Sequence, residues 1–90
     1  MELINEIKRK VEKCTPLEVI VFKGAKHEQP ADFFNERYHS YSSCESTSRD
    51  PGNKIIGYFF ETTDKGILIG DDSRDVFIDE KVIYSYRKLK

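Results

Sequence analysis

The alternation of apolar and polar residues predicts a mostly β chain, because short apolar runs are separated by polar turns along its second half. The runs are rich in β-branched and aromatic residues, which suit a half-buried pleated surface. The gaps between them carry Gly, Asp or Ser, the residues that turns favour. This pattern predicts a four-strand meander over residues 54–87, with strands at 55–62, 67–69, 76–78 and 82–86.

A different spacing opens the chain, where apolar residues recur at steps of three and four and so share one face of a helix. This spacing predicts an amphipathic helix over residues 1–14. Pro16 ends it, and the apolar run that follows predicts a first strand over 17–23. The apolar helix positions are Leu3, Ile4, Ile7, Val11 and Cys14.

Residues 24–53 form a polar, Ser-rich insert between the first strand and the meander. Its few apolar groups predict a mobile loop, because little burial is available to offset the entropy of ordering. A short helix starting at Pro30 would present Phe34, Tyr38 and Tyr41 at positions i, i+4 and i+7. These aromatics are interpreted either as a small satellite core against the sheet or as an exposed docking surface.

With 90 residues, the chain is predicted to be one domain, 1–90, with a modest core. We expect a mainly β fold in which an N-terminal helix precedes a five-stranded, strongly bent antiparallel barrel. The 15 basic and 16 acidic residues nearly balance, so any binding of nucleic acid must depend on a local patch. The absence of a long apolar run and the two sparse cysteines favour a soluble, cytoplasmic protein without a signal peptide.

The order of helix, strand and meander resembles the Sm-like family, and within it the Hfq-like proteins. Gly57, 67–69, 77–78 and Ile83 fall on the positions that the family's strands imply, and 5–9 resembles the basic end of its first helix. The resemblance implies an SH3-like barrel in a homo-oligomeric ring of six or seven subunits, in which strand 76–78 pairs with strand 82–86 of the next subunit. It assigns to the subunit interface Val76, Phe77, Ile78, Val82, Ile83 and Tyr84.

The resemblance also implies a non-enzymatic binder of single-stranded RNA, although two positions depart from the family pattern. Lys65 stands where the family has a stacking aromatic, and Glu80-Lys81 stand in place of a Lys-His pair, so that Glu80 would repel phosphate. A basic rim on the first helix would still bind phosphates without reading sequence. The candidate nucleic-acid-binding residues are Lys8, Arg9, Lys10, Lys65 and Lys81; the alternative is that they are ordinary solvated lysines and arginines.

A second functional hypothesis is a protein-interaction or accessory module. In this reading the barrel is a scaffold, and the insert over 24–53 docks a partner through Phe34, Tyr38 and Tyr41.

Metal binding and catalysis are not predicted. His27, His39 and Cys44, with or without Cys14, match no compact zinc spacing, and the acidic residues 71–80 lack the spacing of a calcium loop. A Cys44–His39 thiol nucleophile would lack an evident orienting group. The sequence therefore predicts no metal, no cofactor and no enzymatic activity.

Overall fold

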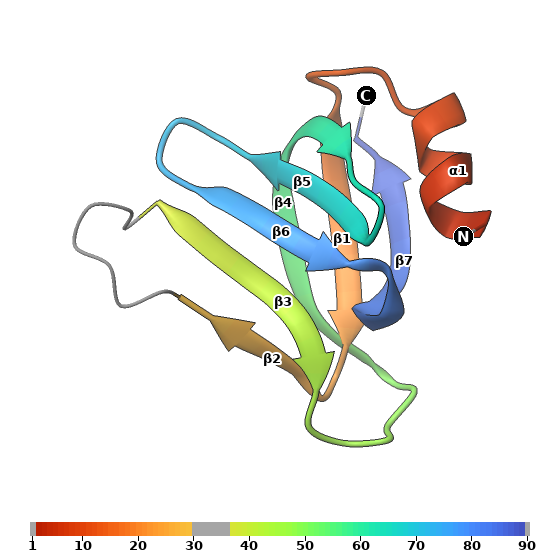
Figure 1. Ribbon diagram of the computed structural model, residues 1–90, viewed down its shortest axis with the longest axis vertical. Helices are drawn as coiled ribbons and strands as arrows, with labels where there is room; N and C mark the ends of the chain where they lie inside the picture. Colours follow the sequence, from red (N-terminus) through yellow and green to blue (C-terminus); the bar gives the residue numbers. More distant parts are fainter. Residues whose placement is uncertain (1, 30–36, 90) are drawn as a thin grey trace.

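The computed structural model describes residues 2–29 and 37–89, which contain one α-helix, one short 3₁₀ helix and seven strands (Figure 1). In chain order, these elements are α1 (Glu2–Lys10), β1 (Pro16–Phe22), β2 (Ala25–Glu28), β3 (Tyr38–Cys44), β4 (Pro51–Thr62), β5 (Gly66–Gly70), β6 (Asp75–Asp79), η1 (Glu80–Val82) and β7 (Ile83–Lys88).

The strands form one sheet in the order β2-β3-β6-β5-β4-β1-β7. All described pairs are antiparallel except β3 with β6, which is parallel. The prediction of a mainly β chain with an N-terminal helix is confirmed. The prediction of five antiparallel strands is wrong, because the described residues form seven strands in a mixed sheet.

The predicted meander is correct for β4, β5 and β6 but not for β7. Asp79 accepts a hydrogen bond from the backbone N–H of Lys81 at 3.0 Å and begins η1. This turn carries the chain away from β6, and β7 pairs with β1 instead, with Glu18 opposite Arg87. A three-residue connection therefore redirects the last strand rather than closing a hairpin.

The insert contains two of the seven strands, which corrects the prediction of a mobile loop. β3 pairs with the outer edge of β6, with Tyr38 opposite Asp75 and Tyr41 opposite Ile78, and β2 adds a further strand. Tyr38 and Tyr41 thus lie on a strand, not on the predicted helix; the rest of that helix, including Phe34, lies outside the described residues. Pairing satisfies backbone groups that β6 would otherwise expose, which explains why a polar segment adopts this structure.

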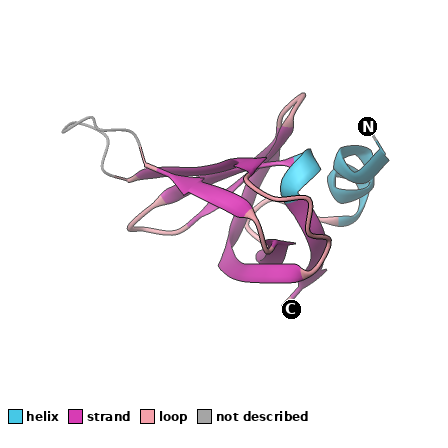
Figure 2. Ribbon diagram, turned by 90° about the horizontal axis from the view of Figure 1, so that it is seen from below, coloured by secondary structure: helices cyan, strands magenta, loops and turns pink. Residues whose placement is uncertain are grey.

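The core lies inside the bend of the sheet, where α1 packs against it. Ile4, Ile7 and Val11 are buried as the helical spacing predicts, whereas Cys14 is exposed, because α1 ends at Lys10 and Cys14 adopts a left-handed backbone (φ 70°). Figures 1 and 2 place α1 and the β2–β3 hairpin at opposite ends of the molecule. From the strands and η1, the core takes Leu17, Val19, Val21, Ile55, Phe59, Ile67, Ile69, Val76, Ile78, Val82 and Ile83.

Candidate functional site

Three elements meet at the end of the sheet that carries α1. The Glu80 carboxylate accepts a hydrogen bond from the backbone N–H of Ile4 at 3.0 Å, and the Glu80 N–H donates to the carbonyl of Lys65 at 2.9 Å. The first bond ties η1 to the start of α1, and the second ties it to the β4–β5 turn. The predicted site residues Lys8 and Lys65 are therefore brought to the same end of the protein.

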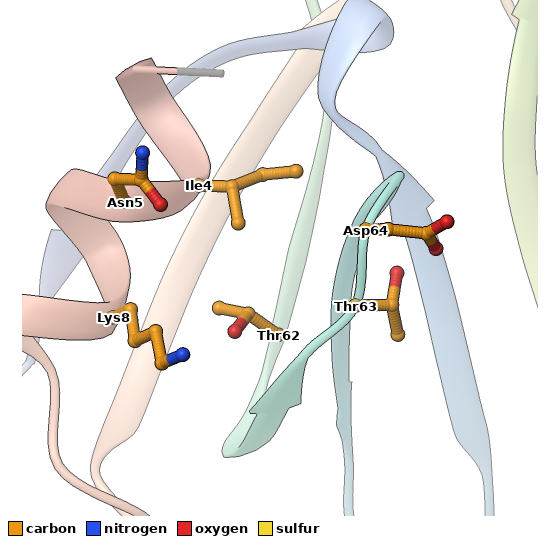
Figure 3. Close-up of a pocket in the computed structure, with 6 residues that line it drawn as sticks. All are labelled: Ile4, Asn5, Lys8, Thr62, Thr63 and Asp64. Atoms are coloured by element: carbon orange, nitrogen blue, oxygen red, sulfur yellow. The ribbon is translucent and has the colours of Figure 1, made fainter.

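A cavity of about 370 Å³ opens between α1 and the end of β4. Figure 3 shows Asn5 and Lys8 projecting from the helix, with the Lys8 side chain extending toward Thr62. The lining residues are Ile4, Asn5, Lys8, Thr62, Thr63 and Asp64. We call this cavity the α1–β4 pocket.

The polar groups of the α1–β4 pocket divide into structural and available ones. The Thr63 hydroxyl accepts hydrogen bonds from the N–H groups of Lys65 (3.2 Å) and Gly66 (3.0 Å), so it shapes the β4–β5 turn. Within 2–29 and 37–89, no hydrogen bond or ion pair engages the side chains of the other four polar lining residues. Asn5, Lys8, Thr62 and Asp64 thus offer a cation, an amide, a hydroxyl and a carboxylate to a ligand.

The remaining basic candidates do not join this pocket. Arg9 and Lys10 are exposed on the last turn of α1; Lys10 lies 3.6 Å from Glu6, and its carbonyl accepts a hydrogen bond from Lys88. Lys81 lines a separate cavity of about 220 Å³ beside Phe22 and the loop after β3. Of the five predicted contacts, Lys8 alone lines the pocket, and Lys65 follows directly after its residue Asp64.

Two of the candidate partner-binding aromatics, Tyr38 and Tyr41, lie half-buried on β3. Tyr41 is half-buried and packs against the core, and its ring lies 5.1 Å from that of His27. Tyr38 is half-buried where β3 begins. This arrangement matches the satellite-core interpretation for Tyr41, while Phe34 lies outside the described residues.

The predicted subunit interface coincides with an occupied edge. β3 pairs with β6 along Val76, Phe77 and Ile78, so a strand of the same chain lies where a neighbouring subunit would pair. Val76, Ile78, Val82 and Ile83 are also core residues. Among the candidates, only Tyr84 has a strongly exposed side chain (46%), on the strand β7.

The histidines and cysteines make no metal centre in the described chain. His27 Nε2 and His39 Nδ1 lie 2.8 Å apart, a hydrogen bond in which one ring donates and the other accepts. Burial, with the charges of His27 and Arg74, lowers the pKa of His39. Cys14 and Cys44 are free thiols, and no group of three potential ligands is found in the described part of the chain.

Glu18 is a further buried polar residue that the sequence analysis did not single out. It lies on the outer face of β1, only 3% exposed, where Arg87 donates a hydrogen bond to it and Lys54 lies 3.1 Å away. The hydrogen bond from Arg87 is the main cause that lowers the pKa of Glu18, and the hydrogen bond from Lys54 is the next largest. A single acidic residue inside an otherwise apolar strand was the signal in the sequence that could have marked Glu18. Its two cationic partners could not be identified in this way, because they lie on β4 and β7, which are far from β1 in the sequence.

Comparison of the chain with models of protein families, with curated proteins and with solved structures finds no match. Neither helix in the described chain has the length and apolar character needed to cross a bilayer.

Proposed function

We propose that this protein binds single-stranded nucleic acid, RNA in particular, in the α1–β4 pocket, and that it does so without catalysis. The proposal is carried by one observation: Asn5 and Lys8 of α1 line the same cavity, of about 370 Å³, as Thr62 and Asp64 at the end of β4. A cavity of this size is within the range of small-ligand sites. Lys8 supplies a phosphate contact, and Lys65 supplies a second one from the adjoining turn.

The other side chains of the α1–β4 pocket suit a base. The Asn5 amide both donates and accepts, and the Asp64 carboxylate accepts, so together they match the mixed donor and acceptor pattern of a base edge. The pocket has no aromatic side chain among its lining residues, so affinity depends mainly on phosphate contacts and falls with salt.

The fold also supports an Sm-like barrel as part of the proposal. Five of the strands follow one another in the sheet as β6-β5-β4-β1-β7, with a helix preceding β1. The resemblance in sequence covers the same five strands. The pairing of β3 with β6 favours binding by a single chain, so the proposal does not require a central pore.

The test is fluorescence anisotropy with labelled oligouridylate, measured across a range of salt concentrations. Lys8→Glu is expected to weaken binding about tenfold or more and to reduce the salt slope by about one. Lys26→Glu is the matched control, because Lys26 is an exposed lysine on β2, at the other end of the molecule. Equal effects of the two substitutions, or no binding by the unmodified protein at low salt, would overturn the proposal.

Asn5→Ala separates base recognition from phosphate attraction. It is expected to weaken binding several-fold while leaving the salt slope unchanged, because an amide releases no counterions. An Asn5→Ala protein that binds oligouridylate as tightly as the unmodified protein would place the base outside the α1–β4 pocket.

A further inference from the structure

A further cavity, of about 460 Å³, lies beside Tyr58 and Phe60 of β4. It is lined by Cys14, Arg37, Tyr58, Phe60, Asp71 and Asp72. None of these residues lines the α1–β4 pocket, so the two cavities are separate. We call this one the Tyr58 cavity.

Aromatic side chains make the walls of the Tyr58 cavity. Tyr58 and Phe60 lie two positions apart on β4, and the Tyr58 side chain is 49% exposed. Gly70 on β5 is the register partner of Tyr58. A Cβ atom at Gly70 would lie 2.3 Å from the carbonyl oxygen of Arg74 and 3.0 Å from Cε2 of Phe60, so the glycine lets the Phe60 ring and the β5–β6 turn pack closely against β5.

Carboxylates from the β5–β6 turn form the rim of the Tyr58 cavity. The Asp71 carboxylate accepts hydrogen bonds from the N–H groups of Ser73 (2.8 Å) and Arg74 (3.1 Å), and the Ser73 bond is the main cause that lowers the pKa of Asp71. Asp71 is therefore held in its charged form. Asp72 beside it is exposed.

Among the described residues that line the Tyr58 cavity, the cation is Arg37, and it is already engaged. Arg37 donates hydrogen bonds to the carbonyls of Asp71 (3.0 Å) and Asp72, and its guanidinium lies 3.6 Å from the Asp75 carboxylate. Among the described lining residues, Asp71 and Asp72 bring two carboxylates and Arg37 brings one guanidinium group, so these residues together carry one net negative charge.

These observations define a ligand class. An anion would meet the Asp71 and Asp72 carboxylates, and a strongly hydrated metal ion would gain little from aromatic walls. A cation with an apolar surface gains from both, because ring faces attract positive charge and a weakly hydrated ammonium is easily desolvated. We propose that the Tyr58 cavity binds an organic cation that carries an alkylated ammonium group.

The experiment is an NMR titration of the full chain with choline and, in parallel, with 3,3-dimethyl-1-butanol, which has the same shape without the charge. Choline is expected to shift the backbone amides around Tyr58, Phe60 and Gly70, and the neutral alcohol to bind about tenfold more weakly. Equal binding of the two compounds would show an apolar cavity only and would overturn the proposal. Absence of shifts with choline at tens of millimolar concentration would also overturn it.

Paired substitutions assign the contacts. Tyr58→Phe keeps the ring and is expected to keep choline binding, whereas Tyr58→Ala is expected to weaken it about tenfold, and Asp72→Asn several-fold. Both positions are exposed, so the variants are expected to fold, which thermal unfolding checks. Choline binding that survives Tyr58→Ala and Asp72→Asn would overturn the proposal. Oligouridylate binding of the same variants is expected to be unchanged, so the outcome is independent of the proposed function.

Discussion

Glu80 and Ile4 are joined by a hydrogen bond from the backbone N–H of Ile4 to Oε2 of Glu80, 3.0 Å long, although 76 positions separate them in the chain. The first N–H groups of a helix have no partner within the helix, and a negative charge is favourable at that end. The resemblance to Hfq-like proteins predicts that Glu80 repels phosphate. The structure shows a further role, because this carboxylate holds the start of α1 beside η1 and so positions Ile4 in the wall of the α1–β4 pocket.

Replacing Glu80 tests this positioning role. Glu80→Ala is expected to lower the free energy of unfolding by about 1 kcal/mol, as the loss of a capping side chain does, while Glu80→Gln keeps an acceptor and costs less. Urea unfolding followed by far-UV circular dichroism measures both. Glu12→Ala, at an exposed position after α1, is the control and is expected to be near neutral. A Glu80→Ala protein as stable as this control would show that the contact contributes nothing.

Glu18 is expected to make stability depend on pH in the acid range. Its pKa in the folded chain lies below the ordinary value of 4.5, chiefly through the hydrogen bond from Arg87. The unfolded chain therefore binds more protons than the folded chain near that value, so this stabilisation is complete above pH 4.5 and is lost as the pH falls. Unfolding free energies between pH 3 and 6 are expected to change less steeply in Glu18→Gln. Glu61→Gln, on an exposed position of β4, is expected to keep the original slope.

His39 is expected to make stability depend on pH near neutrality, and there too stability falls as the pH falls. Burial is the main cause that lowers its pKa below 6.5, and the charges of His27 and Arg74 add to it. Because the folded chain prefers neutral His39, its contribution to stability is complete above pH 6.5 and is lost as the pH falls from 6.5 through the lower pKa of the folded chain. NMR titration of the imidazole protons should give a midpoint below 6.5, and His27→Gln should move it back toward 6.5. A midpoint at or above 6.5 in the unmodified protein would contradict this environment.

Local patterns in the sequence located the elements that carry a clear apolar spacing of their own. The three-and-four spacing of Ile4, Ile7 and Val11 predicts the buried face of α1, and the apolar runs predict β1 and β4 to β7. β2 and β3 were not predicted, because their polar sequences have no strand pattern. β3 is ordered by the edge of β6, a distant segment, and β2 by its pairing with β3.

The same distinction applies to the sites. Lys8 and Lys65 could be proposed as contacts from the sequence, but their pocket could not, because it exists only where α1 packs beside the end of β4. The salt bridges of Glu18 likewise combine strands far apart in the chain, and the Tyr58 cavity combines β4 with turns far from it in the sequence.

Gly57 was singled out by the resemblance in sequence, and the structure explains why the residue at this position is a glycine. A Cβ atom there would lie 2.9 Å from the backbone nitrogen of Gly70, closer than side chains pack against backbone. Gly57→Ala is therefore expected to push β4 and β5 apart and to lower the free energy of unfolding by about 1–3 kcal/mol. Urea unfolding measures the loss, and Asn53→Ala, exposed on the same strand, is the control. Equal stability of the two variants would mean that the strands accommodate the methyl group.

The pairing of β3 with β6 determines which oligomer is expected. A ring of six or seven subunits requires the edge of β6 along Val76 to Ile78, and β3 already occupies it. We therefore expect light scattering to give the mass of a single chain, 10.5 kDa. Ser40→Pro removes a backbone N–H in the middle of β3, opposite Phe77, and is expected to free the edge and make the mass rise with concentration.

The control is Thr47→Pro, which introduces a proline in the loop after β3 instead of in the strand. This variant is expected to keep the mass of one chain. An unmodified protein with six or seven times the mass of one chain would mean that β3 leaves β6 in solution, and the predicted subunit interface would then be restored. If Ser40→Pro unfolds the chain, circular dichroism will show it, and the mass of the unmodified protein still decides between the ring and the single chain. The measurement thus tests directly whether the insert replaces a neighbouring subunit at this edge.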